Sequence, residues 1–406
     1  MTIARLEAPI GRHRVIDAIA GEGLRLFFPI AALHAALWPL LWALVWSLDL
    51  PFADTTTPGQ WHAQEMIIGS FGAALIGFLT SALPEWTDTP RLHGWPLFVL
   101  AGLWGIARGA GLVGGEMLIP LSAVADQVWL TLLIAYALHL CWRRRTTSLI
   151  GFVVFLVALA GAAGALRLAM FRGDFEAGET AIRFASFAFL GLLGLALSRI
   201  TVPVTNLVLD PSEATSPFRP HPGRVNLASG LIGLLLIAEA AGLSEPVRGY
   251  LMLAAGAAFL DRVAEGFVGR EAFRAEIAML SLSSALSGAG LVFGGLSLIG
   301  QPLPFVASLH LMLMGGLGIG MLAVMSIAGL LHTGQPLTFT ASTKLAFALM
   351  VCAVVLRIVP ELLPAVVLPG SPHGLAAGCW AISLLSWLRV YLPLLWSPAT
   401  LASESC

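Results

Sequence analysis

Charged residues are scarce in this 406-residue sequence. They make up 11% of the chain and hydrophobic residues 58%, whereas an ordinary soluble domain carries roughly 25% charged residues. The net charge of −1 and the pI near 6.8 exclude the basic field that a nucleic-acid partner requires. The composition therefore predicts a polytopic membrane protein whose surroundings are the lipid bilayer.

Cysteine is also sparse and poorly spaced for chemistry. The four cysteines are Cys141, Cys352, Cys379 and Cys406, and no two of them form a CxxC pair. Neither a disulfide framework nor a zinc site is expected from this pattern. The first 23 residues also lack an apolar core followed by a small-residue cleavage site, so we expect no removable signal peptide.

Long apolar runs fill most of the remaining sequence. A helix needs about 20 apolar residues to cross a bilayer core about 30 Å thick, and Gly- and Pro-rich joins separate the runs. We therefore predict an all-α bundle of twelve transmembrane helices in one domain over residues 24–396, with short segments over 1–23 and 397–406. The twelve spans are Leu24–Leu48, His62–Leu83, Gly94–Val113, Met117–Cys141, Ser148–Phe171, Thr180–Leu209, Val225–Leu243, Val247–Phe267, Ala275–Leu298, Leu303–Leu331, Ala341–Leu368 and His373–Trp396.

Arginine placement predicts the orientation of these spans. Twelve crossings put both termini on one side, and the loops of that side hold most of the basic residues. The positive-inside rule then places both termini in the cytoplasm. The basic residues on the predicted cytoplasmic side are Arg5, Arg12, Arg14, Arg91, Arg143, Arg144, Arg145, Arg219, Arg224, Arg270, Arg274 and Lys344.

Ionisable residues inside the spans are the candidates for function, because leaving one toward lipid costs at least about 2–3 kcal/mol. The alternative for each is an internal partner or an interfacial position, and we assign Asp126 to that class. His62 and His310 stand apart, because each lies 21 residues before the predicted cytoplasmic end of its span, Leu83 or Leu331. At about 1.5 Å per residue the two imidazoles have similar depth, which suits two axial ligands of one haem.

Other residues near these histidines fit the same hypothesis. Arg108 and Arg167 are predicted near the periplasmic ends of their spans, where they suit haem propionates or simply reach the interface. Glu65, three residues after His62, is a candidate to orient its ring. Met312 is a candidate thioether ligand or a core residue, and the glycines from Gly315 to Gly320 leave room for a flat cofactor or a neighbouring helix.

Two segments carry a resemblance to a known family. The chain reads WHAQEM and GFLTSALPEWT in the second span, and LHLMLMGGLGIGMLAVMSIAGLLHTGQPL in the tenth. These segments, their order and a basic LRLFFP near the N-terminus resemble the NnrS family across nearly the whole chain. The resemblance implies a bacterial inner-membrane protein that binds haem b, with iron and copper both reported, and that is associated with denitrification and resistance to nitric oxide.

The resemblance also assigns individual residues. It supports His62, Glu65, His310 and His332, together with Trp61, Met66, Trp86, Thr333 and Gly334. His332 ends the tenth span, where it is either part of a second metal site, with His34 as a candidate partner, or a helix cap.

One departure from the family pattern bears on copper. Gln64 stands where the family motif WHxHEM has a second histidine, so copper is expected to be lost or depleted. The pairing of the second and tenth spans is also similar to haem-copper oxidases, which serves as a lead for architecture alone.

Three functions remain open at this stage. The first is a haem protein that binds or turns over nitric oxide, or accepts electrons from a membrane or periplasmic donor. The second is a secondary transporter whose intramembrane charges line a substrate path. The third is an accessory or sensor protein in which haem is structural. The sequence does not distinguish catalysis from binding.

Overall fold

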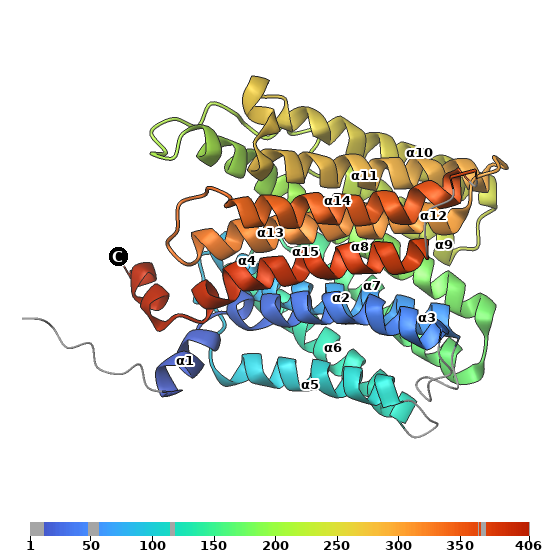
Figure 1. Ribbon diagram of the computed structural model, residues 1–406, viewed down its shortest axis with the longest axis horizontal. Coiled ribbons are helices and arrows are strands. Elements are labelled where there is room, and N and C mark those ends of the chain that lie inside the picture. Colours follow the sequence, from blue (N-terminus) through green and yellow to red (C-terminus); the bar gives the residue numbers. More distant parts are fainter. Residues whose placement is uncertain (1–11, 48–56, 114–117, 364, 367–370, 406) are drawn as a thin grey trace, which may run out of the picture.

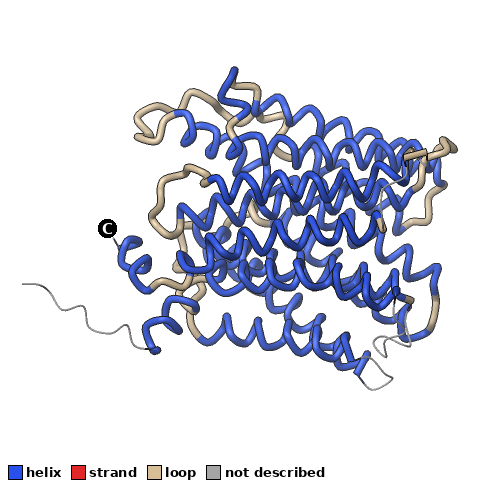
Figure 2. The backbone as a smooth tube through the Cα atoms, in the orientation of Figure 1, coloured by secondary structure: helices blue, strands red, loops and turns tan. Residues whose placement is uncertain are grey.

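Every regular element that the structure describes is helical (Figure 2). The structure is a computed structural model that describes residues 12–47, 57–113, 118–363, 365–366 and 371–405, so Arg5 and Cys406 lie outside it. The elements are α1 (Arg12–Ile19), α2 (Gly23–Ser47), α3 (Pro58–Gln64), η1 (Glu65–Phe71), α4 (Gly72–Trp86), α5 (Trp95–Val113), α6 (Leu118–Arg144), α7 (Ile150–Arg172), α8 (Phe175–Leu209), α9 (Leu227–Ala240), α10 (Glu245–Arg262), η2 (Val263–Gly266), η3 (Gly269–Phe273), α11 (Ala275–Leu298), α12 (Phe305–His310), η4 (Leu311–Gly318), α13 (Ile319–Leu331), α14 (Ala341–Leu362), α15 (Pro372–Leu395) and η5 (Pro398–Ser405).

Within the described residues, ten helices are long and apolar enough to cross a membrane. They include two continuous helices built from three segments each, α3–η1–α4 over Pro58–Trp86 and α12–η4–α13 over Phe305–Leu331. The chain is therefore an all-α, multi-pass membrane protein, as the composition predicts.

The predicted count of twelve spans is not confirmed. The seventh predicted span is α9, whose 14 residues cover about 21 Å and fall short of a bilayer core of about 30 Å. The eighth predicted span becomes α10, which begins at Glu245 and carries Arg248, Asp261 and Arg262. The predicted seventh span extended α9 into its flanking turns, and the predicted eighth span included the short 3-10 helix η2 that follows α10.

The helices pack side by side with their axes roughly aligned (Figure 1). Helix α1 and the C-terminal η5 contact one another at one end of the bundle. The turn after α4 lies at the same end, because the Gly94 N–H donates to the Ala20 carbonyl at 2.7 Å, and the turn after α6 lies beside it, because Arg144 pairs with Asp88 at 3.1 Å. The first and the last described helices therefore lie at one end of the bundle.

The predicted spans Ser148–Phe171 and Thr180–Leu209 leave residues 172–179 as a loop, but the turn between α7 and α8 is shorter than that. Gly173 ends α7 at φ 67°, a left-handed conformation that glycine adopts without steric cost. The side chain of Asp174 then accepts a hydrogen bond from the Ala177 backbone and caps α8. Most of the predicted loop is therefore the first turn of α8, which extends to Leu209 as a helix of 35 residues.

The second and tenth spans share an unusual backbone feature. In each of them the regular α-helix widens to a π-helix shortly after the histidine, over Glu65–Phe71 and Leu311–Gly318. Such wide turns occur frequently at functional sites. The glycines of the second π-helix serve close helix packing, because a Cβ at Gly316 would lie 2.2 Å from the Ser287 hydroxyl and one at Gly318 would lie 2.4 Å from Trp380.

Candidate functional site

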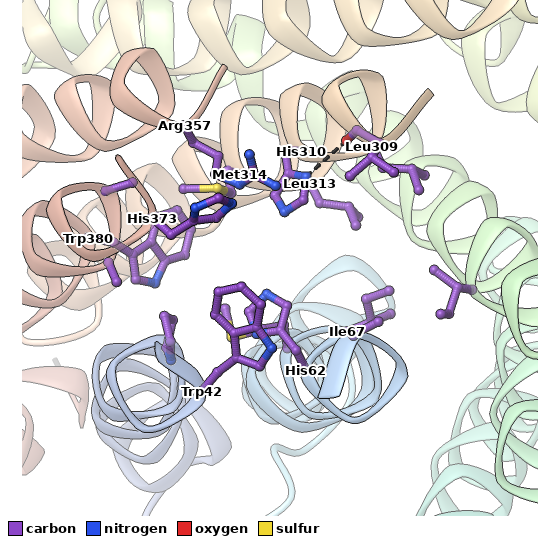
Figure 3. Close-up of a pocket in the computed structure, with 18 of the residues that line it drawn as sticks. Trp42, His62, Ile67, Leu309, His310, Leu313, Met314, Arg357, His373 and Trp380 are labelled. Atoms are coloured by element: carbon purple, nitrogen blue, oxygen red, sulfur yellow. Dashed lines mark hydrogen bonds between the residues drawn. The ribbon is translucent and has the colours of Figure 1, made fainter. Parts of the chain in front are cut away.

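His62 and His310 lie on opposite sides of one cavity (Figure 3). The cavity has a volume of about 280 Å³, close to the lower limit of roughly 300 Å³ for ligand pockets. It lies between α2, the second and tenth spans, α8, α14 and α15, and apolar side chains such as Ile67, Leu309 and Leu313 form much of its wall. The equal depth expected for the two histidines is thus accompanied by a shared space between them.

The two imidazoles differ in their hydrogen bonding. Nδ1 of His310 donates to the Val306 carbonyl at 2.9 Å, so its proton is on Nδ1 and Nε2 is left with a free lone pair. Nδ1 of His62 is buried and has no hydrogen-bond partner among the described residues. The His62 ring packs against Trp42, with ring centroids 4.8 Å apart. Both histidines therefore have nitrogen atoms available to a ligand.

Two further side chains on the cavity wall, one cationic and one titratable, were not predicted to belong to the site. Arg357 of α14 and His373 of α15 line the same space as His310 (Figure 3). The Arg357 guanidinium forms a close ion pair with Glu361, one turn further along α14. The sequence signal was present, because Arg357 interrupts an apolar span, but its neighbours depend on how α14 packs.

Arg108 and Arg167 lie in a second polar region on the other side of the second span. We call this region the buried ion-pair network and define it as Glu65, Arg108, Asp126, Arg167 and His34. Arg108 donates to Glu65 at 3.0 Å and to Oδ2 of Asp126 at 2.7 Å. Arg167 donates to Asp126 at 3.0 Å and to Glu65 at 3.3 Å. Two guanidinium groups thus share two carboxylates.

This network connects five membrane helices with little exposure. Glu65 and Asp126 are 0% exposed, and Arg108 and Arg167 are 4% and 3% exposed. The Asp126 carboxylate also accepts from the Trp129 indole at 3.0 Å, and His34 lies 3.6 Å from Glu65. With His34 neutral the charges balance, which is the condition for burying ionised groups in a membrane.

The contacts of the buried ion-pair network differ from the contacts that the sequence predicted for Glu65, Arg108 and Arg167. Neither arginine lines the histidine cavity, because both guanidinium groups contact Glu65 and Asp126. The Glu65 carboxylate contacts Arg108, Arg167 and His34, and the structure gives it no bond to His62. Glu65 does not line the cavity, whereas the next residue, Met66, does.

The remaining predicted residues lie in several environments. Trp61 is buried, donates to the Gly111 carbonyl at 3.3 Å and does not line the cavity. Met312 packs against Gly290 of α11, while Met314 faces the cavity in its place. His34 stacks on Trp38 with centroids 4.3 Å apart.

His332 lies apart from His34. Its Nδ1 is 2.9 Å from the Glu22 carboxylate at the end of the bundle that holds the turn after α13. The structure therefore does not bring His34 and His332 to one place. No group of three metal-ligating side chains occurs among the residues that the structure describes.

Comparison with protein families supplies the identification. The family model described as NnrS protein matches residues 18–399, nearly the whole chain. The chain belongs to the NnrS family. Comparison with curated proteins gives no match, and comparison with solved structures gives none either. Membership in the NnrS family associates this membrane protein with nitric oxide stress, as the two sequence motifs imply.

Proposed function

We propose that this protein is a bacterial inner-membrane haem protein that binds nitric oxide, or transfers electrons on its behalf, in nitrosative stress or denitrification. His62 and His310 are the proposed axial ligands of a haem between the second and tenth spans. The observation that carries the proposal is that these two imidazoles, 248 positions apart in the sequence, face one cavity. Family membership supports the association with nitric oxide.

The residues around the cavity fit a haem. An axial histidine commonly donates its second ring nitrogen to a carbonyl, which fixes the tautomer, and His310 makes such a bond to Val306. The buried, unpartnered Nδ1 of His62 and the apolar wall formed by Leu309 and Leu313 also suit an iron-bound macrocycle. When bound, the haem would supply a one-electron redox centre while both histidines hold it, and it would bind nitric oxide where one of the two histidines gives up its place.

Arg357 and His373 are the proposed partners of the haem propionates. They lie on the cavity wall, and the planar guanidinium of Arg357 would share its N–H donors between a propionate and Glu361, with which it already pairs. Arg108 and Arg167 have their guanidinium groups engaged with Glu65 and Asp126. Their proposed contribution is to hold the second span in place, so that His62 keeps its position at the cavity.

Copper is proposed to be absent or depleted. Gln64 occupies the position of the second family histidine, is fully buried and donates to Asp126 at 3.2 Å. A neutral amide held in this way is a poor substitute for an imidazole ligand. Metal analysis of the purified protein tests this point, and stoichiometric copper would contradict it.

For topology, we propose twelve crossings with both termini in the cytoplasm, an arrangement shared in outline with haem-copper oxidases. In this proposal α9 and α10, which pack against one another, supply the seventh and eighth crossings, and the turns that flank the 14 residues of α9 complete its passage through the bilayer core. The basic turns after α4 and α6, with Arg91 and Arg143–Arg145, lie at the proposed cytoplasmic end.

Cysteine labelling tests this topology. In a variant without native cysteines, Ser148→Cys should react from the cytoplasm and Glu176→Cys from the periplasm. Reaction of both from the same side would contradict the proposed crossings.

A secondary transporter is the second candidate, and one observation favours it. The second and tenth spans both depart from regular α-helix beside a shared cavity, and interrupted helices commonly form substrate sites in transporters. The cavity would then bind an anion near Arg357. An accessory protein with structural haem is the third reading.

A visible absorption spectrum distinguishes these candidates. Protein expressed with ample haem should show a Soret band, which His62→Ala and His310→Ala should each abolish or shift. His221→Ala, in the exposed loop after α8, is the matched control and should leave the band unchanged. A band unchanged by both cavity substitutions would defeat the ligand assignment, and absence of haem would favour the transporter.

A further inference from the structure

A second, smaller cavity adjoins the histidine cavity. It has a volume of about 70 Å³, and its wall is formed by α2, the second span, α7, α8 and the tenth span. Phe71 lines both cavities. Leu313 faces the histidine cavity and Leu317, one turn later, faces the second one, so the two spaces follow one another along the same helices.

The wall of the second cavity is wholly apolar. No lining residue has a side chain with a nitrogen or oxygen atom, and all of them except Phe78 and Val324 are buried. The lining residues are Phe28, Phe71, Ala74, Leu75, Phe78, Phe152, Phe189, Leu192, Leu193, Ala196, Leu317, Gly320, Met321, Val324 and Met325.

The volume of the second cavity and the apolar chemistry of its wall determine which molecules it can hold. A single water-sized molecule needs roughly 10–15 Å³ of such space, so 70 Å³ admits a diatomic molecule. A buried water needs two to four polar partners, and apolar cavities stay dry while binding xenon or small hydrocarbons. An ion or a polar metabolite would lose its hydration without compensation.

We infer that this second cavity binds a small uncharged gas molecule of the nitric oxide class and holds it beside the His62–His310 cavity. The inference rests on the proposed function for the identity of the gas, but not for the existence of the site. A gas dissolves well in the bilayer core, and a dry cavity inside the membrane concentrates it next to the imidazoles. Phe71 lies at the junction and is the side chain a gas molecule passes.

Xenon pressurisation of protein crystals tests the cavity directly. We expect anomalous density from xenon between Ala74 of α4 and Leu192 of α8 in the native protein. Ala74→Leu should remove that density, because the added side chain fills the space. The matched control Ala158→Leu makes the same change in α7 at a position that does not line either cavity, and it should retain the density.

Two further variants keep the outcome interpretable. Ala196→Val fills the cavity from α8 with a smaller side chain and should weaken xenon binding if Ala74→Leu fails to fold. His310→Ala should retain xenon, because the gas site does not depend on haem, which separates this test from that of the proposed function. Ordered water in the native cavity, absence of xenon there, or xenon retained in both filling variants would overturn the inference.

Discussion

The two sides of the second membrane span, Pro58–Trp86, both present ionisable side chains, but in opposite conditions. On one side Glu65 meets Arg108 and Arg167, and every charged group has a partner of opposite charge. On the other side His62 faces His310 across open space, and its buried Nδ1 has no partner among the described residues.

The difference indicates which polar residues are structural. Paired charges whose hydrogen-bonding groups meet one another have their bonding capacity satisfied by the protein itself. An imidazole that lies beside a cavity and has a ring nitrogen without a hydrogen-bond partner can still bind a ligand. Residue type and depth in the membrane alone do not distinguish a structural ion pair from a side chain that can bind a ligand.

The largest effect is expected from breaking the ion-pair network. Asp126→Ala would leave two buried guanidinium groups sharing one carboxylate and would remove the acceptor of the Trp129 indole. Breaking a buried pair in this way costs about 3–5 kcal/mol. We expect a loss of that size in the free energy of unfolding, measured by denaturant titration in detergent.

A matched double variant sharpens the interpretation. Asp126→Leu combined with Arg167→Met removes one charge of each sign, so it should cost less than Asp126→Ala alone. Asp88→Ala, which removes an exposed ion pair with Arg144, is the surface control. A double variant less stable than the single one would show that the network is not governed by charge balance.

The sequence predicted the helices well because apolar length decides where a chain crosses a membrane. The predicted span Ala275–Leu298 coincides with α11, and Leu303–Leu331 differs from its helix by two residues. Errors occurred at α9 and α10, where apolar residues continue beyond the helix. Such ends depend on turn geometry, which periodicity does not report.

The candidate site was only partly accessible from sequence. Equal depth along two spans, together with the resemblance of both segments to the NnrS motifs, selected His62 and His310 as a pair. The partners of Arg108 were not predictable, because Glu65 and Asp126 lie 43 and 18 positions away on separate helices. The position of Arg357 on the cavity wall likewise depends on the packing of α14, which no local pattern encodes.

An ion pair at the end of the bundle should show a smaller, pH-dependent effect. Burial opposes ionisation of Glu22, but the hydrogen bond and charge of His332, together with Arg91, hold the pKa of its carboxyl below 4.5. Because the folded-state pKa is lowered, the stabilisation is present above the unfolded pKa of about 4.3 and is lost as pH falls through the folded value. Glu22→Gln should lower stability by roughly 1–3 kcal/mol at pH 7.

The pH dependence provides the control for this prediction. Thermal unfolding followed from pH 7 down to pH 3 should show the native protein and Glu22→Gln converging at the acid end. A constant difference between the two proteins across that range would mean that the charge of Glu22 contributes nothing.

A substitution on the cavity side of the second and tenth spans should change stability only slightly when no ligand is bound. His310 makes one hydrogen bond, to Val306 in its own helix, and a single such bond contributes about 1 kcal/mol. We therefore expect His310→Ala to lower the melting temperature of haem-free protein only slightly. Haem should raise the melting temperature of the native protein and not that of the variant, because stabilisation requires binding to the folded state. Equal stabilisation of both proteins would place the ligand elsewhere.

The smallest effect is expected at an exposed ion pair, which completes the comparison. Arg224 and Asp261 approach to 2.6 Å, but their side chains are 26% and 47% exposed. Water screens such a pair and the side chains lose freedom in forming it, so exposed pairs contribute about 0–1 kcal/mol. Arg224→Ala should therefore shift the free energy of unfolding by less than about 1 kcal/mol, measured under the same conditions as Asp126→Ala. Both substitutions remove one partner of a short ion pair, and they differ in burial. If Arg224→Ala proved as destabilising as Asp126→Ala, distance and not burial would determine what an ion pair contributes in this protein.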